Sequence, residues 1–511
     1  MQDLRRRDLK QVSGFSGAED AAQWEEATKP MPREQSGKRK RRLRSRPGQR
    51  LAWAIAISGC ACSVATADDL VPTLSPDRLE DAPSTRLDPY PTFDNFAWRA
   101  FVALNWPARA RADGRGEPDR GKTLGDPGPR VWETFKSRYE LFQIGPDGRP
   151  IAPSAYASIE GRNPCGDGFD NRTKTLASFV PYAEFNQPGF ALGEFLNPLV
   201  ARNHTYTRYE IRLNRPEYEA IAANGWSEGR NLPDAAHPAD LPIGSIAVKA
   251  SWRILTDADT PTVRARYYVV RAANVVDVAK SVAAGKIVCS KSDIALVGMH
   301  VMVKTRYRPQ WLWSTFEHVD NVRPAGEGEA SEPDAKDAGA PYSYFEETQP
   351  ERRLPPLGSP EAEPISMANP PKLDPEPMQV TRSHPIHAST MAMNRAYWAL
   401  PGVKGTVWEH YMLVASQWPT VPVPPGPEND GRFFPGLAVD PDTPREAYQS
   451  ADAAAEYREN LVNTTMETYL QDAPSSCMSC HAKVANARGR DFAGILADLH
   501  EPGARRPLPS R

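Results

Sequence analysis

The sequence predicts an α+β fold, in which a β-rich antiparallel body is flanked by helices and followed by a short helical C-terminal segment. The helices are indicated first by residues 93–105, where apolar side chains recur at helical spacing until Pro107 ends the run. The sheet is indicated by β-branched and aromatic runs, several of them alternating and separated by turn residues: 243–255, 263–270, 294–304 and 310–319.

The N-terminal part of the body, 68–322, contains these runs and a second predicted helix at 131–142. Residues 323–378 are rich in Pro, Glu, Asp, Ala and Gly and poor in large apolar side chains, so they predict a linker or long surface loop. The tryptophans and tyrosines of 379–443 predict that the body resumes there.

Residues 444–511 predict the helical C-terminal segment. Residues 444–470 have a strongly helical composition, and Pro444 suits the first turn of a helix. A last short helix is expected at 491–499.

The N-terminal region has the order of charges and small residues that is typical of an export signal. Residues 38–50 are densely basic, 51–64 are apolar and uncharged, and Ala65-Thr66-Ala67 provides a cleavage site. The apolar run is shorter than the about 20 residues that span a bilayer. We therefore expect 1–67 to be an N-terminal extension and signal peptide that is removed, and the body to be periplasmic or otherwise exported.

A lipid anchor is the alternative to simple cleavage. Residues 57–60, Ile-Ser-Gly-Cys, resemble a bacterial lipobox, in which Cys60 would be acylated and become the new N-terminus. Such an anchor would be the chain's contact with a membrane. Both alternatives place the body outside the cytoplasm.

Charge argues against a nucleic-acid partner. The first 50 residues carry 14 Lys and Arg against 7 Asp and Glu, whereas the whole chain has a net charge of −2. The exported body is therefore mildly acidic, and nucleic-acid binding would need a basic face.

Two cysteines of the body, Cys165 and Cys289, have no evident metal or haem partner in the sequence. In an oxidising compartment such a pair usually forms a disulfide, here across 123 intervening residues. A functional thiol is the alternative.

The most specific motif is Cys477-Met478-Ser479-Cys480-His481. Two thiols three positions apart can form thioethers with the two vinyl groups of one porphyrin, and the following imidazole can reach its iron, so C-x-x-C-H indicates covalent haem attachment. A thiol–disulfide oxidoreductase is the main rival, but that class places the pair at a helix start within a βαβ unit. A zinc ribbon would need a second cysteine pair, which the body lacks.

The motif resembles that of the c-type cytochromes, and residues 313–322 are similar to stretches of exported bacterial proteins described as cytochrome c family members. The resemblance implies one covalent haem c, thioethers from Cys477 and Cys480, and His481 as the fifth iron ligand. It implies one-electron transfer with a redox partner protein that the sequence does not identify. A basic partner would be attracted to the acidic body.

The chain departs from the common small cytochromes, which supply a sixth ligand, usually Met, downstream of the motif. Only 30 residues follow His481, and none is Met. The sixth ligand therefore stays open among residues elsewhere in the chain: His300, Met302, His318, His384, His387, His410, Met412, Met466 and His500. If the iron has no sixth protein ligand, the alternative function is a haem enzyme, peroxidase-like, or a gas sensor.

Three other constellations have simpler explanations. The histidines of 384–387, with His410, could hold a metal, but their spacing is non-standard and Pro385 disrupts helical geometry. His318 and Asp320 are expected on one side of a strand, as an acid–base pair requires, although such pairs are more often structural hydrogen bonds. The 12 tryptophans could stack on sugars, but most lie in apolar runs typical of a core.

Overall fold

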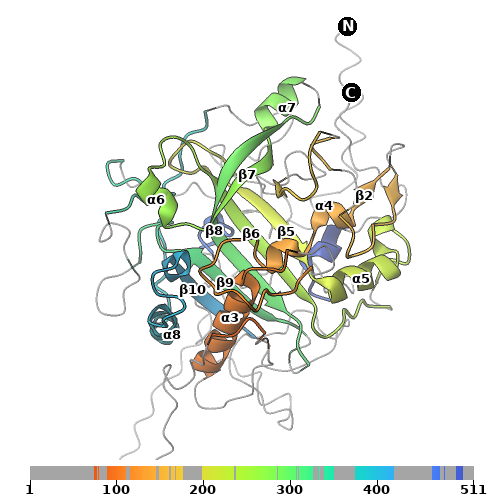
Figure 1. Cartoon of the computed structure of the whole chain (residues 1–511), viewed down its shortest axis with the longest axis horizontal. Helices are drawn as coiled ribbons and strands as arrows, with labels where there is room; N and C mark the ends of the chain where they lie inside the picture. Colours follow the sequence, from red (N-terminus) through yellow and green to blue (C-terminus); the bar gives the residue numbers. More distant parts are fainter. Residues whose placement is uncertain are drawn as a thin grey trace, which may run out of the picture. The chain divides into compact units, whose positions relative to one another are not determined.

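An eight-stranded sheet organises the protein (Figure 1), with strand order β1-β5-β6-β8-β7-β4 and with β9 and β10 added beside β8. The chain is seen in a computed structural model, and the described residues belong to one compact unit, Val64–Arg511. The structure describes residues 74–77, 79, 89–110, 115–145, 149–159, 163–166, 168–176, 198–234, 237–284, 286–306, 308, 310–325, 333, 339–349, 374–418, 463–471, 477, 481 and 491–498.

The longest strand, β8 (Cys289–Val303), lies at the centre of the sheet. Its N-terminal half pairs with β7 (Val269–Val276) and its C-terminal half with β9 (Leu312–His318), while β6 (Ile246–Ile254) runs along its other side. The sheet is completed by β1 (Lys136–Ser137), β4 (Thr175–Leu176), β5 (Arg208–Leu213) and β10 (Tyr411–Gln417). The antiparallel pairing expected from the sequence is confirmed for these strands, except that β4 and β7 are parallel.

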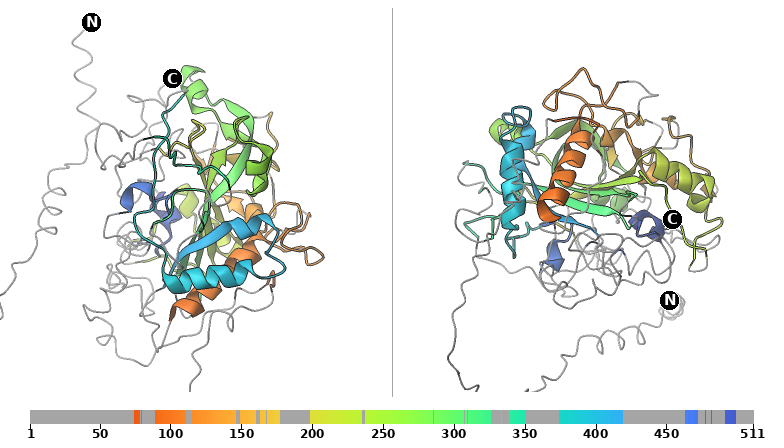
Figure 2. Two further views of the ribbon diagram at one scale, coloured as in Figure 1. Left: turned by 90° about the vertical axis from the view of Figure 1, so that its left-hand side faces the viewer. Right: turned by 90° about the horizontal axis from the view of Figure 1, so that it is seen from below.

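Helices α3 (Pro89–Asn105) and α8 (Ala388–Trp398) cover one face of the sheet (Figure 2). The apolar face of α3 packs into the largest core cluster, where Trp98 stacks on Tyr397 of α8 and Phe101 stacks on Phe316 of β9. Trp98 Nε1 also donates to Asn394 Oδ1 at 2.9 Å. We call this side of the sheet the α3 face.

The opposite side of the sheet, which we call the C-terminal face, carries a second core cluster. It is covered by α5 (Arg215–Ala223), by the 3-10 turn η6 (Trp226–Glu228), and by segments from the end of the chain. These include η12 (Thr468–Leu470) and η14 (Gly494–Asp498). The two faces are distinct because successive side chains of a strand point to opposite sides.

The disulfide between Cys165 and Cys289 is confirmed, with their Cα atoms 5.6 Å apart. It ties the segment before β4 to the first residue of β8. No helix among the described ranges is long and apolar enough to cross a membrane.

Several predicted boundaries were wrong. Residues 131–142 form the 3-10 turn η3 (Trp132–Thr134), the short strand β1 and the one-turn helix α4 (Arg138–Leu141) instead of one helix. Residues 263–270 do not form one strand, because α6 (Pro261–Ala265) precedes β7; Thr260 Oγ1 accepts from Val263 N, and Pro261 suits the first helical turn. The last short helix is reduced to η14.

The α+β fold class is confirmed. Residues 1–73, Cys60 among them, lie outside the described residues, as do most of 323–378 and the predicted helix before residue 463. The remaining short elements are β2 (Gln143–Ile144), β3 (Pro150–Ile151), α7 (Val278–Ala284) and η9 (Val407–His410).

Candidate functional site

Strand register places a row of polar side chains on the C-terminal face. Lys249 of β6 lies opposite His300 of β8, and His300 lies opposite Thr315 of β9. In the neighbouring row, Met302 of β8 lies opposite Trp313 of β9. Both rows face the segments that carry the C-x-x-C-H motif.

Residues 463–471 lie against this face and lead toward the motif. Asn463 Nδ2 donates to Thr315 Oγ1 at 2.9 Å, and Thr465 Oγ1 lies 2.6 Å from Ser251 Oγ. Gly298 permits this approach, because a Cβ atom there would lie 2.4 Å from Thr465 Oγ1.

A buried ion pair fixes the same segment. The side chain of Arg382 donates to Glu317 Oε2 at 3.0 Å, and Thr464 N donates to Glu317 Oε1 at 2.7 Å. All three residues are buried. Because an isolated buried charge is costly, this pairing holds the segment in one position.

His300 and Glu467 form the polar centre of the face. Glu467 Oε1 lies 2.8 Å from His300 Nε2, and the other ring nitrogen, Nδ1, lies 2.9 Å from Thr315 Oγ1. Despite burial, the charges of His300 and Lys249 hold the pKa of Glu467 below its usual value. Burial lowers the pKa of Lys249, against the opposing effects of Glu467 and Cys477.

The imidazole of His481 is held in a defined orientation. Its Nδ1–H donates to the carbonyl oxygen of Phe492 at 2.8 Å, and its ring centroid lies 4.4 Å from that of Trp313. Its Nε2 has no hydrogen-bond partner within the described ranges. Burial lowers the pKa of His481 to about 4, so the ring is neutral at pH 7.

A strained turn presents the Phe492 carbonyl to His481. Asp491 and Phe492 both have left-handed backbone angles, with φ values of 50° and 55°, which are uncommon for such residues. The turn is held because Asp491 Oδ2 accepts from Lys304 Nζ and from Leu241 N, each at 2.7 Å. Gly494 follows the turn, and a Cβ atom at that position would lie 2.8 Å from His481 Cε1.

Cys477 and His481 both have helical backbone conformation. Cys477 is partly buried against the second core cluster, which also contains Met302, Trp313 and Phe492. Cys480 lies outside the described residues.

These residues fit a haem iron ligand. Histidine ligands usually donate the ring N–H that does not face the metal to a carbonyl or carboxylate, and metal binding needs the neutral imidazole. His481 meets both conditions, and the apolar side chains of Trp313 and Phe492 lie in the core cluster beside it. Among the described residues, those around His481 included, no three or more His, Cys, Asp or Glu side chains gather as a metal site.

The candidates for a sixth iron ligand are scattered. His300 uses both ring nitrogens, as described above. Met466 is wholly buried, and Met412 packs in a separate cluster with Ile386 and Met391. His500 lies outside the described residues. Met302 is the candidate that shares a core cluster with Cys477.

His318 and Asp320 lie together as expected, but in a structural arrangement. Asp320 forms two hydrogen bonds with Arg266, at 2.6 and 2.7 Å. His318 Nε2 donates to the Arg266 carbonyl and its Nδ1 accepts from Asp320 N. The ring is fully buried against Tyr267, and burial lowers the pKa of His318 to about 3. No ring nitrogen is left for acid–base chemistry.

The histidines of 384–387 do not form a metal site with His410 in the part of the chain that is described. His387 instead caps α8, because its side chain accepts from Ser389 N. His410 lies beside His318, with ring centroids 6.0 Å apart.

No protein-family model, curated protein or solved structure matches this chain. The cytochrome c resemblance therefore rests on the sequence alone, and no comparison supports it. Sequence reasoning missed Glu467, Lys249 and Phe492, which carry no motif of their own and reach the site only through tertiary packing.

Proposed function

We propose that this protein is an exported c-type cytochrome that carries one covalent haem and transfers one electron at a time. Cys477 and Cys480 would hold the haem by thioether bonds, and His481 would be its proximal ligand. A bound haem supplies an iron that alternates between the ferric and ferrous states.

The observation that carries this proposal is the hydrogen bond from His481 Nδ1–H to the Phe492 carbonyl. It selects the tautomer in which Nε2 carries the lone pair, and it fixes the ring plane. The strained Asp491–Phe492 turn also supports His481 as a haem ligand, because backbone strain of this kind is more frequent at functional sites.

We propose Met302 as the sixth ligand. It lies directly opposite Trp313, whose ring contacts His481, and it packs in the cluster that contains Cys477. Methionine ligation raises the reduction potential of a haem relative to other axial ligands.

The compartment and partner follow from the same proposal. The signal-like sequence and the Cys165–Cys289 disulfide support an exported, periplasmic protein, with a lipid anchor at Cys60 as the alternative to a cleaved signal. A partner redox protein with a basic surface would complement the acidic body.

The attachment is tested by expressing the protein in a host with haem-maturation machinery. Cys477→Ser and Cys480→Ser should each leave one thioether and shift the pyridine haemochrome band, and His481→Ala should abolish stable haem incorporation. His237→Ala is the matched control, because that side chain is 88% exposed. Unchanged spectra in both cysteine variants would contradict the attachment.

The sixth ligand is tested with carbon monoxide. With Met302 bound, the ferrous spectrum should be low-spin and indifferent to the gas. Met302→Ala should open the iron to carbon monoxide and lower the reduction potential. A wild-type spectrum that already shifts with the gas would favour the haem enzyme or gas sensor instead.

A further inference from the structure

A large cavity lies on the α3 face, the side of the sheet opposite His481. Its volume is about 1230 Å³, and its walls come from the loop after α3, the segment before β4, and the residues from α6 to the start of β7. Arg212 of β5 reaches it from the sheet, whereas its neighbours Ile211 and Leu213 point to the C-terminal face.

The cavity is strongly basic within an acidic protein. Eight arginine and lysine side chains line it, against three acidic side chains, Glu133, Glu140 and Asp293. The basic residues are Arg109, Arg115, Arg130, Arg172, Lys174, Arg212, Arg264 and Arg271. The chain as a whole has a net charge of −2.

The acidic side chains are already paired. Lys174 Nζ contacts Glu133 Oε1 at 3.0 Å and Glu210 Oε1 at 2.5 Å, and Arg212 Nε contacts Glu210 Oε2 at 2.6 Å. These charges hold the pKa of Glu210 at about 2 despite its burial, so it stays ionised. The other two acidic residues that line the cavity are also paired: Glu140 with Arg115, and Asp293 with Arg264.

Four arginines are left without a carboxylate among the described residues. Arg130 is buried, and its guanidinium donates to the carbonyls of Asn105, Leu124 and Asp126 while lying over the Tyr268 and Trp408 rings. Arg109, Arg172 and Arg271 are the others, and all three are exposed. An anion in the cavity would supply the counter-charge that buried Arg130 lacks. The three exposed arginines would add charge-assisted hydrogen bonds to it.

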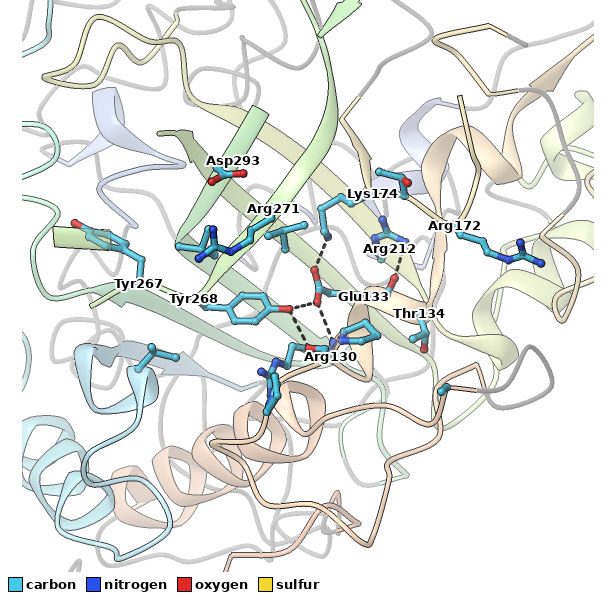
Figure 3. A pocket seen from close by; sticks show the side chains of 18 of the residues that line it. Arg130, Glu133, Thr134, Arg172, Lys174, Arg212, Tyr267, Tyr268, Arg271 and Asp293 are labelled. Carbon is cyan, nitrogen blue, oxygen red and sulfur yellow. Dashed lines mark hydrogen bonds and ion pairs between the residues drawn. The ribbon is translucent and has the colours of Figure 1, made fainter. Parts of the chain in front are cut away.

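The basic side chains of the cavity are spread around a paired centre. Figure 3 shows Glu133, Tyr268 and Lys174 at the centre, with Arg271 on one side and Arg172 on the other. The lining also includes the ring of Tyr268 and the apolar side chains of Val269 and Pro129. The space exceeds that needed by an inorganic anion, because pockets of this size hold organic ligands.

We propose that this cavity binds an organic anion that carries acidic groups at two separated positions. The acidic groups pair with Arg172 and Arg271 at its two sides, and the body of the ligand contacts Tyr268 and Val269. The carboxylate or phosphate nature of the acidic groups is distinguished by the probes below. The site does not depend on a haem.

The test is titration calorimetry of the full exported chain at low salt. The probes are suberate, which carries two carboxylates on a straight chain, and inorganic tripolyphosphate, with the dimethyl ester of suberate as the neutral control. We expect one of the two anions to bind with one site per chain, the ester not to bind, and the affinity to fall as salt is added. Failure of both anions to bind at millimolar concentration would overturn the proposal.

The variants locate the site. Arg172→Gln and Arg271→Gln should each weaken binding about tenfold, as expected for loss of one charge-assisted contact. Arg230→Gln makes the same charge change on an arginine that is 60% exposed and lies outside the cavity, and it should change affinity by less than about twofold. Equal losses in all three variants would mean a nonspecific charge effect and would contradict the assignment.

Discussion

At the scale of single residues, two buried carboxyl groups give the protein a marked pH dependence. Glu217 of α5 is fully buried, and neither carboxylate oxygen has a hydrogen-bond partner in the described part of the chain. Burial and the nearby charge of Asp491 raise the pKa of Glu217 to about 8. Burial also raises the pKa of Asp491 to about 7, against the effect of Lys304.

We predict that Glu217→Gln stabilises the protein at alkaline pH. A carboxyl whose pKa is higher in the folded state than in the unfolded state favours folding at low pH, and that advantage is lost as pH rises from about 4.5 to about 8. The variant should lack this loss. At pH 8 its free energy of unfolding should therefore exceed that of the wild type by on the order of 3 kcal/mol. Urea unfolding at a series of pH values measures it.

The matched control is Glu219→Gln on the same helix, where the side chain is 53% exposed. It should change stability by no more than about 0.5 kcal/mol at any pH. Parallel pH profiles for wild type and Glu217→Gln would contradict the assigned pKa.

Only part of the candidate site could be predicted at this scale. Cys477 and His481 belong to a C-x-x-C-H motif, and that spacing predicts haem attachment. Cys165 and Cys289 are the two cysteines of the body outside the motif, so their pairing could be predicted. The Phe492 carbonyl could not be found in this way, because any residue has a carbonyl and only the Asp491–Phe492 turn aims this one. The arginines of the cavity come from distant segments, and no local pattern joins them.

At the scale of elements, residues 463–471 dock on the C-terminal face of the sheet. The segment fits because Gly298 leaves space for Thr465 beside Ser251, and because Glu317 accepts hydrogen bonds from Thr464 and Arg382. Small-to-large changes in such tight contacts force the neighbours apart.

We predict that Gly298→Ala destabilises the protein by about 1–3 kcal/mol, because its Cβ would lie 2.4 Å from Thr465 Oγ1 and 2.6 Å from Ser251 Oγ. Thermal unfolding measures the effect. Gly168→Ala is the control, since a Cβ atom there meets no other atom within 4 Å. If the two variants lose the same stability, the segment does not dock on β8 as described.

The long, strongly patterned elements were the ones that the sequence could predict. The predicted helix at 93–105 corresponds to α3, and the runs at 243–255, 294–304 and 310–319 correspond to β6, β8 and β9. Residues 131–142 mix helical spacing with four aromatic residues. Tertiary contacts divide them, because β1 pairs with β5 and Glu140 forms ion pairs with Arg115 and Lys136. β5 was missed because its alternating charged residues, Arg208, Glu210 and Arg212, are buried. Glu210 forms ion pairs with Arg212 and Lys174, and Arg208 donates to backbone carbonyls.

At the scale of the whole molecule, one sheet separates two sites. The proposed haem lies on the C-terminal face, and the basic cavity lies on the α3 face. The Cys165–Cys289 disulfide joins two residues 124 positions apart and closes a loop that includes β4, β5, β6 and β7. It therefore restrains the wall of the cavity and the centre of the sheet together.

We predict that the double variant Cys165→Ala/Cys289→Ala loses about 4 kcal/mol of unfolding free energy, because the cross-link no longer restricts the unfolded chain. Denaturant unfolding with and without a thiol reductant measures the loss. The reductant should destabilise the wild type and leave the variant unchanged. A variant that is as stable as the oxidised wild type would show that the cross-link does not stabilise the fold.

The central claim is the covalent haem at Cys477, Cys480 and His481. The most direct measurement is the intact mass of the denatured, exported protein, made in a host with haem-maturation machinery. We predict an increase equal to one haem, which persists under denaturing conditions and disappears in the double variant Cys477→Ser/Cys480→Ser. A mass equal to that of the polypeptide alone, from cells that mature other c-type cytochromes, would contradict the account.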